Sequence, residues 1–187
     1  MTASLHVLTT GYADDRVAST VTLLTEGDIV AVVDPGMVAD RRLILDPLIA
    51  LGVDPGQVTD VIFSHHHPDH TLNAALFPQA RFHDHMAVYR DDIWEDRDAD
   101  GHALSSSISL LKTPGHTAED ISTLATTDQG LVVLTHLWWG ADGPADDPFA
   151  PDRAQLRAAR ERILALDPAL IVPGHGEPFA PGPSTPL

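Results

Sequence analysis

Short apolar runs separated by turn-forming residues fill the first third of the chain and predict strands. Residues 5–9, 21–25 and 29–33 each form such a run. Glu-Gly-Asp at 26–28 separates the last two runs and predicts a hairpin turn. A fourth run, 61–63, has three apolar residues in succession, which is typical of a short strand buried on both faces.

Helical periodicity is clearest near the carboxyl end. Residues 154–166 place apolar side chains on one face and arginines on the other, so we expect a helix whose arginines are solvated. Residues 40–51 also have apolar positions near helical spacing, and Pro47 is expected to kink this helix or to restart it. A short helical stretch is expected to follow residue 70 and reach 76. Further strands are expected at 80–82, 108–111, 121–125, 131–135 and 170–172.

Two segments have no regular pattern. Residues 91–102 contain five aspartates and one glutamate around Trp94, and they are expected to form either an acidic flap over a site or, preferably, a solvated connector. Residues 178–187 contain four prolines and are expected to form a loose tail. With no internal repeat and no linker in view, residues 1–187 are expected to form one domain.

Composition limits the classes of protein. The chain has 187 residues, of which 43% are hydrophobic, and this suffices for one well-buried core and is short for two. It has no cysteine, so disulfides are excluded and a metal site must use nitrogen and oxygen ligands. Such ligands suit zinc, iron or manganese.

Charge and the amino terminus restrict partners and location. The net charge of −16, from 27 acidic and 11 basic residues, repels polyphosphate backbones, so extended nucleic-acid binding is not expected. Coding bias or salt adaptation explains the acidity more simply than a specific partner does. Neither a signal peptide nor a run of membrane-spanning length is visible, so a cytoplasmic protein with no membrane association is expected.

The segment 64–70, Ser-His-His-His-Pro-Asp-His, follows the fourth predicted strand directly. His65 and His67 are two positions apart, so on an extended chain their side chains project the same way. A proline then ends the strand, and Asp69 and His70 at the following turn can face the same ion or a neighbouring one. The spacing predicts a metal site, and the alternative is a loop of solvated histidines.

Two later histidines each follow a Pro-Gly turn after an apolar run, His116 in Thr-Pro-Gly-His-Thr and His175 in Ile-Val-Pro-Gly-His-Gly. Such a turn presents the next side chain at the edge of a strand. Together with the first motif, the pattern resembles the metallo-β-lactamase superfamily from about residue 21 to residue 176. The resemblance implies an α/β fold, the four-layer αββα sandwich, with a metal site at one edge of its two sheets.

The resemblance also implies roles for individual residues. The positions that match metal ligands of the superfamily are His65, His67, Asp69, His70, His116 and His175. Asp34 in Val-Asp-Pro-Gly matches a carboxylate that orients a ligating imidazole, whereas the sequence alone makes a simple turn cap equally acceptable. Phe-Pro after the first motif and Pro-Gly-His-Gly near the end resemble the short members typified by metallo-β-lactamase domain-containing protein 1.

One position departs from the resembled superfamily. Its members usually place an aspartate that bridges two metals after the strand at 131–135, and this chain has His136 there. A carboxylate offers an oxygen to each of two cations, whereas a neutral imidazole has one free lone pair. Either one ion dominates, or His136 is a terminal ligand of a second ion beside Asp69, His70 and His175, or it is turned away from the site. The second arrangement is preferred, with zinc as the expected metal, one or two ions and preferably two, while iron or manganese stays open.

The resulting hypothesis is a metallo-hydrolase of a small ester, thioester, lactone, amide or phosphodiester, in which metal-activated water attacks and Asp69 also carries a proton to the leaving group. An uncharged or positively charged substrate suits the acidic chain. The alternatives are a mononuclear iron oxygenase like the persulfide dioxygenases of the same superfamily, and a catalytically idle metal-binding module. The oxygenase is less favoured because His65, His67 and His116 lack the carboxylate of a facial iron site. The oligomeric state is left open.

Other polar and aromatic residues lie close to these motifs in the sequence. Trp138 and Trp139 are expected to belong to the core, with a pocket wall as the alternative. His-Asp-His at 83–85 is expected to be solvated and not to touch the metal.

Overall fold

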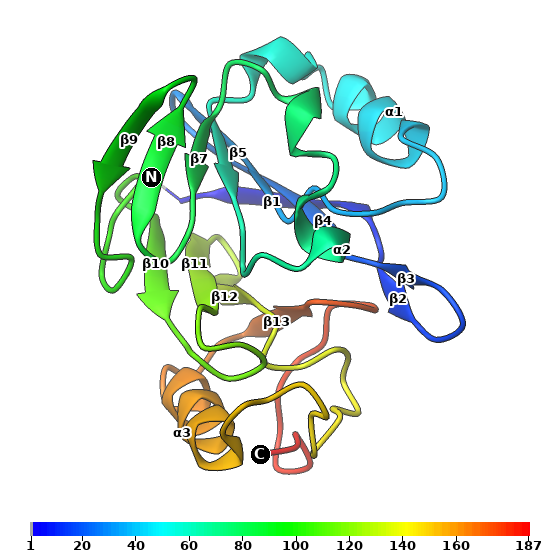
Figure 1. Ribbon diagram of the computed structural model, residues 1–187, viewed down its shortest axis with the longest axis vertical. Helices are drawn as coiled ribbons and strands as arrows, with labels where there is room; N and C mark the ends of the chain where they lie inside the picture. Colours follow the sequence, from blue (N-terminus) through cyan, green and yellow to red (C-terminus); the bar gives the residue numbers. More distant parts are fainter. Residues whose placement is uncertain (1) are drawn as a thin grey trace.

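The computed structural model describes residues 2–187 and contains two facing sheets with helices on their outer sides (Figure 1). The strands of the larger sheet are β1 (Ser4–Thr9), β4 (Val21–Glu26), β5 (Ile29–Val33), β6 (Asp60–Ile62), β7 (Arg81–His83), β8 (Ala87–Arg90) and β9 (Ile93–Asp96), in that order. The smaller sheet contains β10 (Ile108–Lys112), β11 (Ile121–Thr127), β12 (Gly130–Thr135) and β13 (Leu170–Pro173). A separate hairpin pairs β2 (Tyr12–Ala13) with β3 (Val17–Ala18).

The helices are α1 (Arg42–Ala50), α2 (Pro68–Thr71) and α3 (Arg153–Leu164), with single 3₁₀ turns η1 (Pro55–Gln57) and η2 (Ala74–Leu76). Pro47 lies inside α1 without interrupting it, so the expected restart is wrong. Asp152 begins α3 by accepting hydrogen bonds from the amides of Ala154 and Gln155. Among the described residues, no helix has the length and the apolar character needed to cross a membrane.

Three groups of buried apolar side chains separate four layers of structure. The first group lies between the two sheets and includes Leu24, Ile62, Ile108 and Leu134. The second joins α1 to the larger sheet through Ile44, Leu48, Val32 and Val61, and the third joins α3 to the smaller sheet through Leu156, Ile163, Val133 and Ile171. The order is therefore helix, sheet, sheet, helix, and the predicted αββα sandwich is confirmed.

Strand direction explains where the polar segments leave the sheets. β5 and β6 are parallel in the larger sheet, and β12 and β13 are parallel in the smaller one. β10 and β12 are both antiparallel to β11, so they too run in the same direction. The carboxyl ends of parallel strands lie at one edge of a sheet, so the loops that follow them collect at a common rim.

Arg160 on α3 is fully buried, which corrects the expectation that all arginines of this helix are solvated. Its Nε donates to the Leu137 carbonyl at 2.9 Å, and its two terminal nitrogens donate to the carbonyls of Ala145 and Pro144 at 3.0 and 2.7 Å. The guanidinium carbon also lies 5.6 Å from the centre of the Trp138 ring. These partners compensate for the loss of water around a buried charge, and helical periodicity does not show them.

The strands β8 and β9 form a hairpin at the edge of the larger sheet, so the first part of segment 91–102 is regular where the sequence predicts irregular structure. Tyr89 and Trp94 lie opposite each other, and their rings stack 5.1 Å apart. All four side chains of β9 are exposed. Charged side chains on an edge strand oppose pairing with another sheet.

The final segment, 178–187, is tied to the body of the fold at two points. The amide and carbonyl of Phe179 exchange hydrogen bonds of 2.9 and 2.8 Å with Ile171 of β13. The carbonyl of Pro186 accepts a hydrogen bond of 2.8 Å from Nε1 of Trp138. These contacts differ from the loose tail that the proline content predicts.

Candidate metal centre

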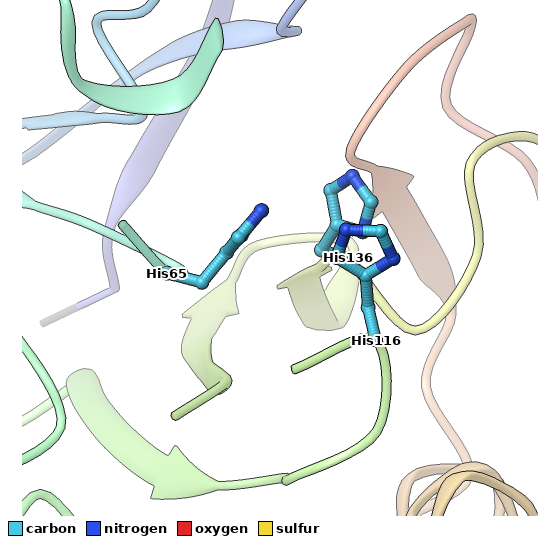
Figure 2. Close-up of side chains that lie close together, drawn as sticks. All are labelled: His65, His116 and His136. Carbon is cyan, nitrogen blue, oxygen red and sulfur yellow. The ribbon is translucent and has the colours of Figure 1, made fainter. Parts of the chain in front are cut away.

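Six imidazoles and one carboxylate converge at the rim where the two sheets meet. They follow β6 (His65 and His67), lie on α2 (Asp69 and His70), and follow β10, β12 and β13 (His116, His136 and His175). Figure 2 shows His65 pointing across the rim toward His116 and His136. The ring centres of these three residues are 4.1 to 5.0 Å apart. All seven residues predicted as metal ligands are thus brought together.

The nitrogen atoms form two groups that share one residue. His65, His116 and His136 have ring nitrogens within 4.8 Å of one another, and so do His70, His136 and His175. His136 is therefore not turned away, and it adjoins both groups rather than the second group alone.

The two remaining predicted ligands each lie beside one group. Nδ1 of His67 is 3.1 Å from Nε2 of His116, which places His67 beside the first group. Oδ2 of Asp69 is 3.3 Å from Nε2 of His70 and 3.7 Å from Nε2 of His175, which places Asp69 beside the second.

Two ring nitrogens at the centre are buried without a hydrogen-bond partner, Nε2 of His65 and Nδ1 of His136. Nε2 of His70 is also buried, and its contact at the centre is with Asp69 at 3.3 Å. A buried polar atom without a partner costs free energy, so such atoms are rare unless a ligand completes them. Neutral imidazole nitrogens facing one another, with a carboxylate beside them, are a donor set that fits zinc. The side chains therefore fit a bound divalent metal.

The outward-facing nitrogens of four rings do have partners. Nδ1 of His70 donates to Asp34 at 2.9 Å, Nδ1 of His116 to Asp147 at 2.7 Å and Nδ1 of His175 to the Ala18 carbonyl at 2.8 Å, while Nδ1 of His65 lies 3.0 Å from the Ser64 hydroxyl. A proton held on Nδ1 leaves Nε2 free as a metal ligand and fixes the plane of the ring. The outer contacts thus orient the inner nitrogens.

Asp34 has the orienting position that the resemblance implies. One of its oxygens accepts from His70 and the other accepts from the backbone amide of Ser64 at 2.7 Å. It therefore links the end of β5 to the motif after β6 and to α2.

Asp147 is a supporting residue that the sequence did not reveal. Besides His116, its carboxylate accepts hydrogen bonds from Nε1 of Trp139 at 3.0 Å and from the amide of Phe149 at 2.9 Å. Burial alone would raise the pKa of Asp147, but these hydrogen bonds outweigh burial. The pKa is lowered overall, and the carboxylate stays ionised. Asp147 lies in an aperiodic loop, so neither spacing nor periodicity distinguishes it from the other aspartates of the chain.

Charge at the centre is concentrated on Asp69 and His70 in the metal-free protein. Burial raises the pKa of Asp69, but hydrogen bonding and attraction to His70 outweigh it and bring the value to about 2. Burial lowers the pKa of His70, but Asp34 and Asp69 together raise it to about 9. In the metal-free protein, His70 therefore carries a proton beside Asp69, and binding of a metal cation displaces this proton.

Gly174 makes room for His136. A Cβ atom at this position would lie 2.2 Å from Cδ2 of His136, well inside contact distance. The glycine of Pro-Gly-His, directly after β13, is therefore needed for the His136 ring to lie where it does.

The centre opens into a cavity of about 440 Å³. Its lining comprises Ala13, Asp14, Val17, His67, Pro68, Asp69, His116, His136, Trp139, Phe149 and His175. Trp139 and Phe149 stack with their ring centres 6.0 Å apart and form an apolar wall, whereas Trp138 is buried in the core against α3. Trp138 therefore has the expected position in the core, and Trp139 has the alternative position in the pocket wall.

The hairpin β2–β3 forms one side of the cavity mouth through Ala13, Asp14 and Val17. The sequence did not reveal this hairpin, because strands of two residues show no periodicity. The acidic segment 91–102 contributes no side chain to the cavity lining. The alternative that this segment forms a flap over the site is therefore wrong.

The metal-free protein is expected to lose stability as the pH falls from about 7 to about 5. Burial lowers the pKa of His175, and burial with repulsion between imidazoles lowers those of His65 and His136 well below 6.5. The unfolded chain then binds more protons than the folded one, so the free energy of unfolding decreases with falling pH. Two groups oppose this change, Asp120, whose pKa burial raises to about 6, and His66, whose pKa is raised by its hydrogen bond to Asp84.

Urea denaturation of chelator-treated protein across this pH range measures the effect. A denaturation midpoint that is unchanged or higher at the acidic end would contradict it. His70 acts in a different window, because its raised pKa of about 9 gives stability that is complete below 6.5 and lost as the pH rises through about 9.

Comparison with known families identifies the fold family. The family description of the metallo-β-lactamase superfamily matches residues 14–137. The chain belongs to the metallo-β-lactamase superfamily. The match contains the first histidine motif, His116 and His136, so the family predicted from the sequence motifs is confirmed.

Relatives within the superfamily include metallo-β-lactamase domain-containing protein 1 of Xenopus laevis, which is 32% identical over 195 residues covering 94% of this chain and 81% of that protein. The proteins of the same name from Rattus norvegicus and Homo sapiens are 34% and 33% identical, and the matches span 61% and 58% of their lengths. The predicted likeness to this group of short members is confirmed.

Solved structures of the superfamily share the fold. A protein described as a metallo-β-lactamase from Thermotoga maritima superposes with a TM-score of 0.76 at 22% identity, covering 97% of this chain and all of that one. A dizinc quorum-quenching lactonase in complex with a product gives a TM-score of 0.64 at 16% identity, covering 84% of this chain and 72% of that chain.

Proposed function

We propose that this protein is a zinc-dependent hydrolase of small carbonyl or phosphoryl substrates, within the range of esters, thioesters, lactones, amides and phosphodiesters. The observation that carries the proposal is the convergence of buried imidazole nitrogens, two of them without a partner, on a cavity with an apolar wall. Convergent polar groups at the base of a largely apolar pocket are typical of active sites.

The donor atoms suit two zinc ions that share the rim. His65, His67 and His116 would hold the first ion, and Asp69, His70 and His175 the second. His136 is the remaining ligand and adjoins both groups. We assign it to the second ion, where Asp69 supplies the negative charge that an imidazole lacks.

Bound zinc supplies an activated water at neutral pH and polarises the oxygen of the substrate. Asp69 lines the cavity, is ionised at neutral pH, and carries a proton between the attacking and leaving groups. Trp139 and Phe149 bind the apolar part of the substrate and exclude water from that side.

The cavity favours a small substrate with an apolar substituent. Its volume of about 440 Å³ lies near the lower end of ordinary ligand sites. The net charge of −16 disfavours an anionic substrate, so uncharged esters and lactones come before phosphodiesters. The lactonase among the structural neighbours makes lactones the first substrates to test.

An iron oxygenase is the second candidate, because Asp69, His70 and His175 together offer two imidazoles and one carboxylate. The hydrolase ranks higher because the centre has a further group of ligands, made of imidazoles alone, around His65 and His116. This group would hold an additional ion, which a mononuclear oxygenase does not need.

Removal and return of metal tests the hydrolase. Chelator-treated protein is expected to hydrolyse nitrophenyl acetate, γ-butyrolactone or bis-nitrophenyl phosphate at least about a hundredfold more slowly than the zinc-loaded protein. Zinc is expected to restore turnover as its content approaches about two equivalents per chain. The proposal is wrong if no zinc, manganese or iron form turns over any of these substrates, or if a form with one iron consumes oxygen instead.

A further inference from the structure

A second group of possible ligands lies outside the zinc centre, on the other side of the histidine motif. His66, between His65 and His67, points toward the loop after β7. Its Nε2 is 3.2 Å from Oδ2 of Asp84, and the ligand atoms of His66, Asp84 and His85 all lie within 4.8 Å of one another. Alternation of side chains along an extended segment explains why His66 faces away from its two neighbours.

Asp84 is held in place with one oxygen directed toward His66. The residue is buried, and its Oδ1 accepts hydrogen bonds of 2.8 Å from the amides of Met86 and Ala87. Burial raises its pKa, but the hydrogen bonds from His66 and from the two amides lower it overall. The carboxylate is therefore ionised and its orientation is fixed by the backbone.

His85 supplies the second independent sign of a ligand. Its Nδ1 is buried and has no hydrogen-bond partner, and the residue lies beside an ionised carboxylate and another imidazole. A buried nitrogen without a partner costs free energy that a bound cation would recover. The neighbouring His83 is not part of this group, because its Nε2 is bonded to Asp60 at 2.8 Å.

The spacing suits a metal as well as a hydrogen bond. Two ligands about 2.0 to 2.1 Å from a tetrahedral zinc ion are about 3.3 Å apart. The separation of 3.2 Å between His66 Nε2 and Asp84 Oδ2 therefore allows a cation to replace the proton between them with little movement.

We propose that His66, Asp84 and His85 form a second metal site, separate from the zinc centre, that binds a divalent cation of the Zn²⁺ or Co²⁺ class with water as the remaining ligand. Two imidazoles and one carboxylate are the ligand types that such ions take. The site ties the loop after β7 to the segment that carries His65 and His67. It does not depend on the hydrolase activity proposed above.

The site is expected to bind more weakly than the zinc centre. It has three protein ligands, and the His66 side chain is 42% exposed. Arg97 also donates to the Asp84 carbonyl at 3.0 Å and brings a positive charge close to the ligands. Glu119 partly offsets this, because its charge acts favourably on a cation at His66.

Titration of the metal-stripped full chain with Co²⁺, followed by calorimetry and by visible absorption, tests the proposal. His85→Ala is expected to bind one Co²⁺ fewer per chain, or to bind the weakest ion at least about tenfold less tightly. The matched control is His6→Ala on β1, an exposed histidine, and it is expected to match the wild type. The double variant His116→Ala/His175→Ala is expected to lose tight sites and to keep the weak one.

Circular dichroism and thermal melting establish that each variant is folded, and His85→Gln replaces His85→Ala if the latter is not. If the number and the affinity of bound Co²⁺ ions are the same in the wild type and in the folded His85 variant, the proposal is wrong and His66 and Asp84 form an ion pair only.

Discussion

Asp69→Asn is expected to lower hydrolytic turnover by about a hundredfold to ten-thousandfold. Asparagine keeps the size of the side chain but removes the negative charge that faces Nε2 of His70 and Nε2 of His175 at 3.3 and 3.7 Å. It removes, at the same time, a proposed metal ligand and the group proposed to carry a proton. Kinetics on the best substrate from the metal-reconstitution screen, with metal content measured on the same samples, shows the effect.

Metal content separates the two roles of Asp69. A variant that retains both zinc ions and still loses turnover indicates proton transfer, whereas loss of one ion indicates ligation. Asp14→Asn is the matched control, because Asp14 lines the same cavity from the exposed hairpin β2–β3. The control is expected to change turnover by less than about threefold, as for a screened surface charge. If turnover of Asp69→Asn falls by less than tenfold, Asp69 has no essential role in catalysis.

Arg160→Met is expected to lower the free energy of unfolding by about 3 to 5 kcal/mol. The substitution retains most of the side-chain volume but leaves the carbonyls of Leu137, Pro144 and Ala145 without their donor. These carbonyls belong to the segment between β12 and α3, which also carries Asp147, so the support of His116 is expected to loosen as well. Urea denaturation of the metal-free protein gives the change in stability without a contribution from bound zinc.

Arg157→Met provides the comparison within the same helix. Arg157 is exposed and pairs with Glu161 one turn further along at 2.9 Å, so its loss is expected to cost less than about 1 kcal/mol. Equal stability losses in the two variants would show that the buried contacts of Arg160 contribute nothing beyond an ordinary surface ion pair.

The layered fold could be predicted because most of its strands are continuous apolar runs. The strands β4, β5, β6 and β12 are largely buried and show this directly in the sequence. β9 was missed because an exposed edge strand needs no apolar face, and its charges resemble those of a loop. Arg160 was misplaced because its burial depends on carbonyls of a distant loop, which a helical pattern does not contain.

The candidate centre could be predicted as a set of residues but not as an arrangement. The spacing in the first motif and the two Pro-Gly-His turns mark six of the seven side chains, and the superfamily resemblance marks His136. The position of His136 between two groups depends on the contact between β12 and β13, and the role of Asp147 depends on how the loop before α3 folds back. Both are tertiary features that leave no local trace in the sequence.

The close approach of Gly174 to His136 has an evolutionary consequence. An ancestor with aspartate at position 136 would accept histidine in its present orientation if position 174, directly after β13, already had a residue without a Cβ atom, since a Cβ there would occupy the space of the ring. Along such a lineage we therefore expect glycine to come first and histidine second. The reverse path, back to aspartate, stays open at any time, because a smaller side chain meets no obstacle there.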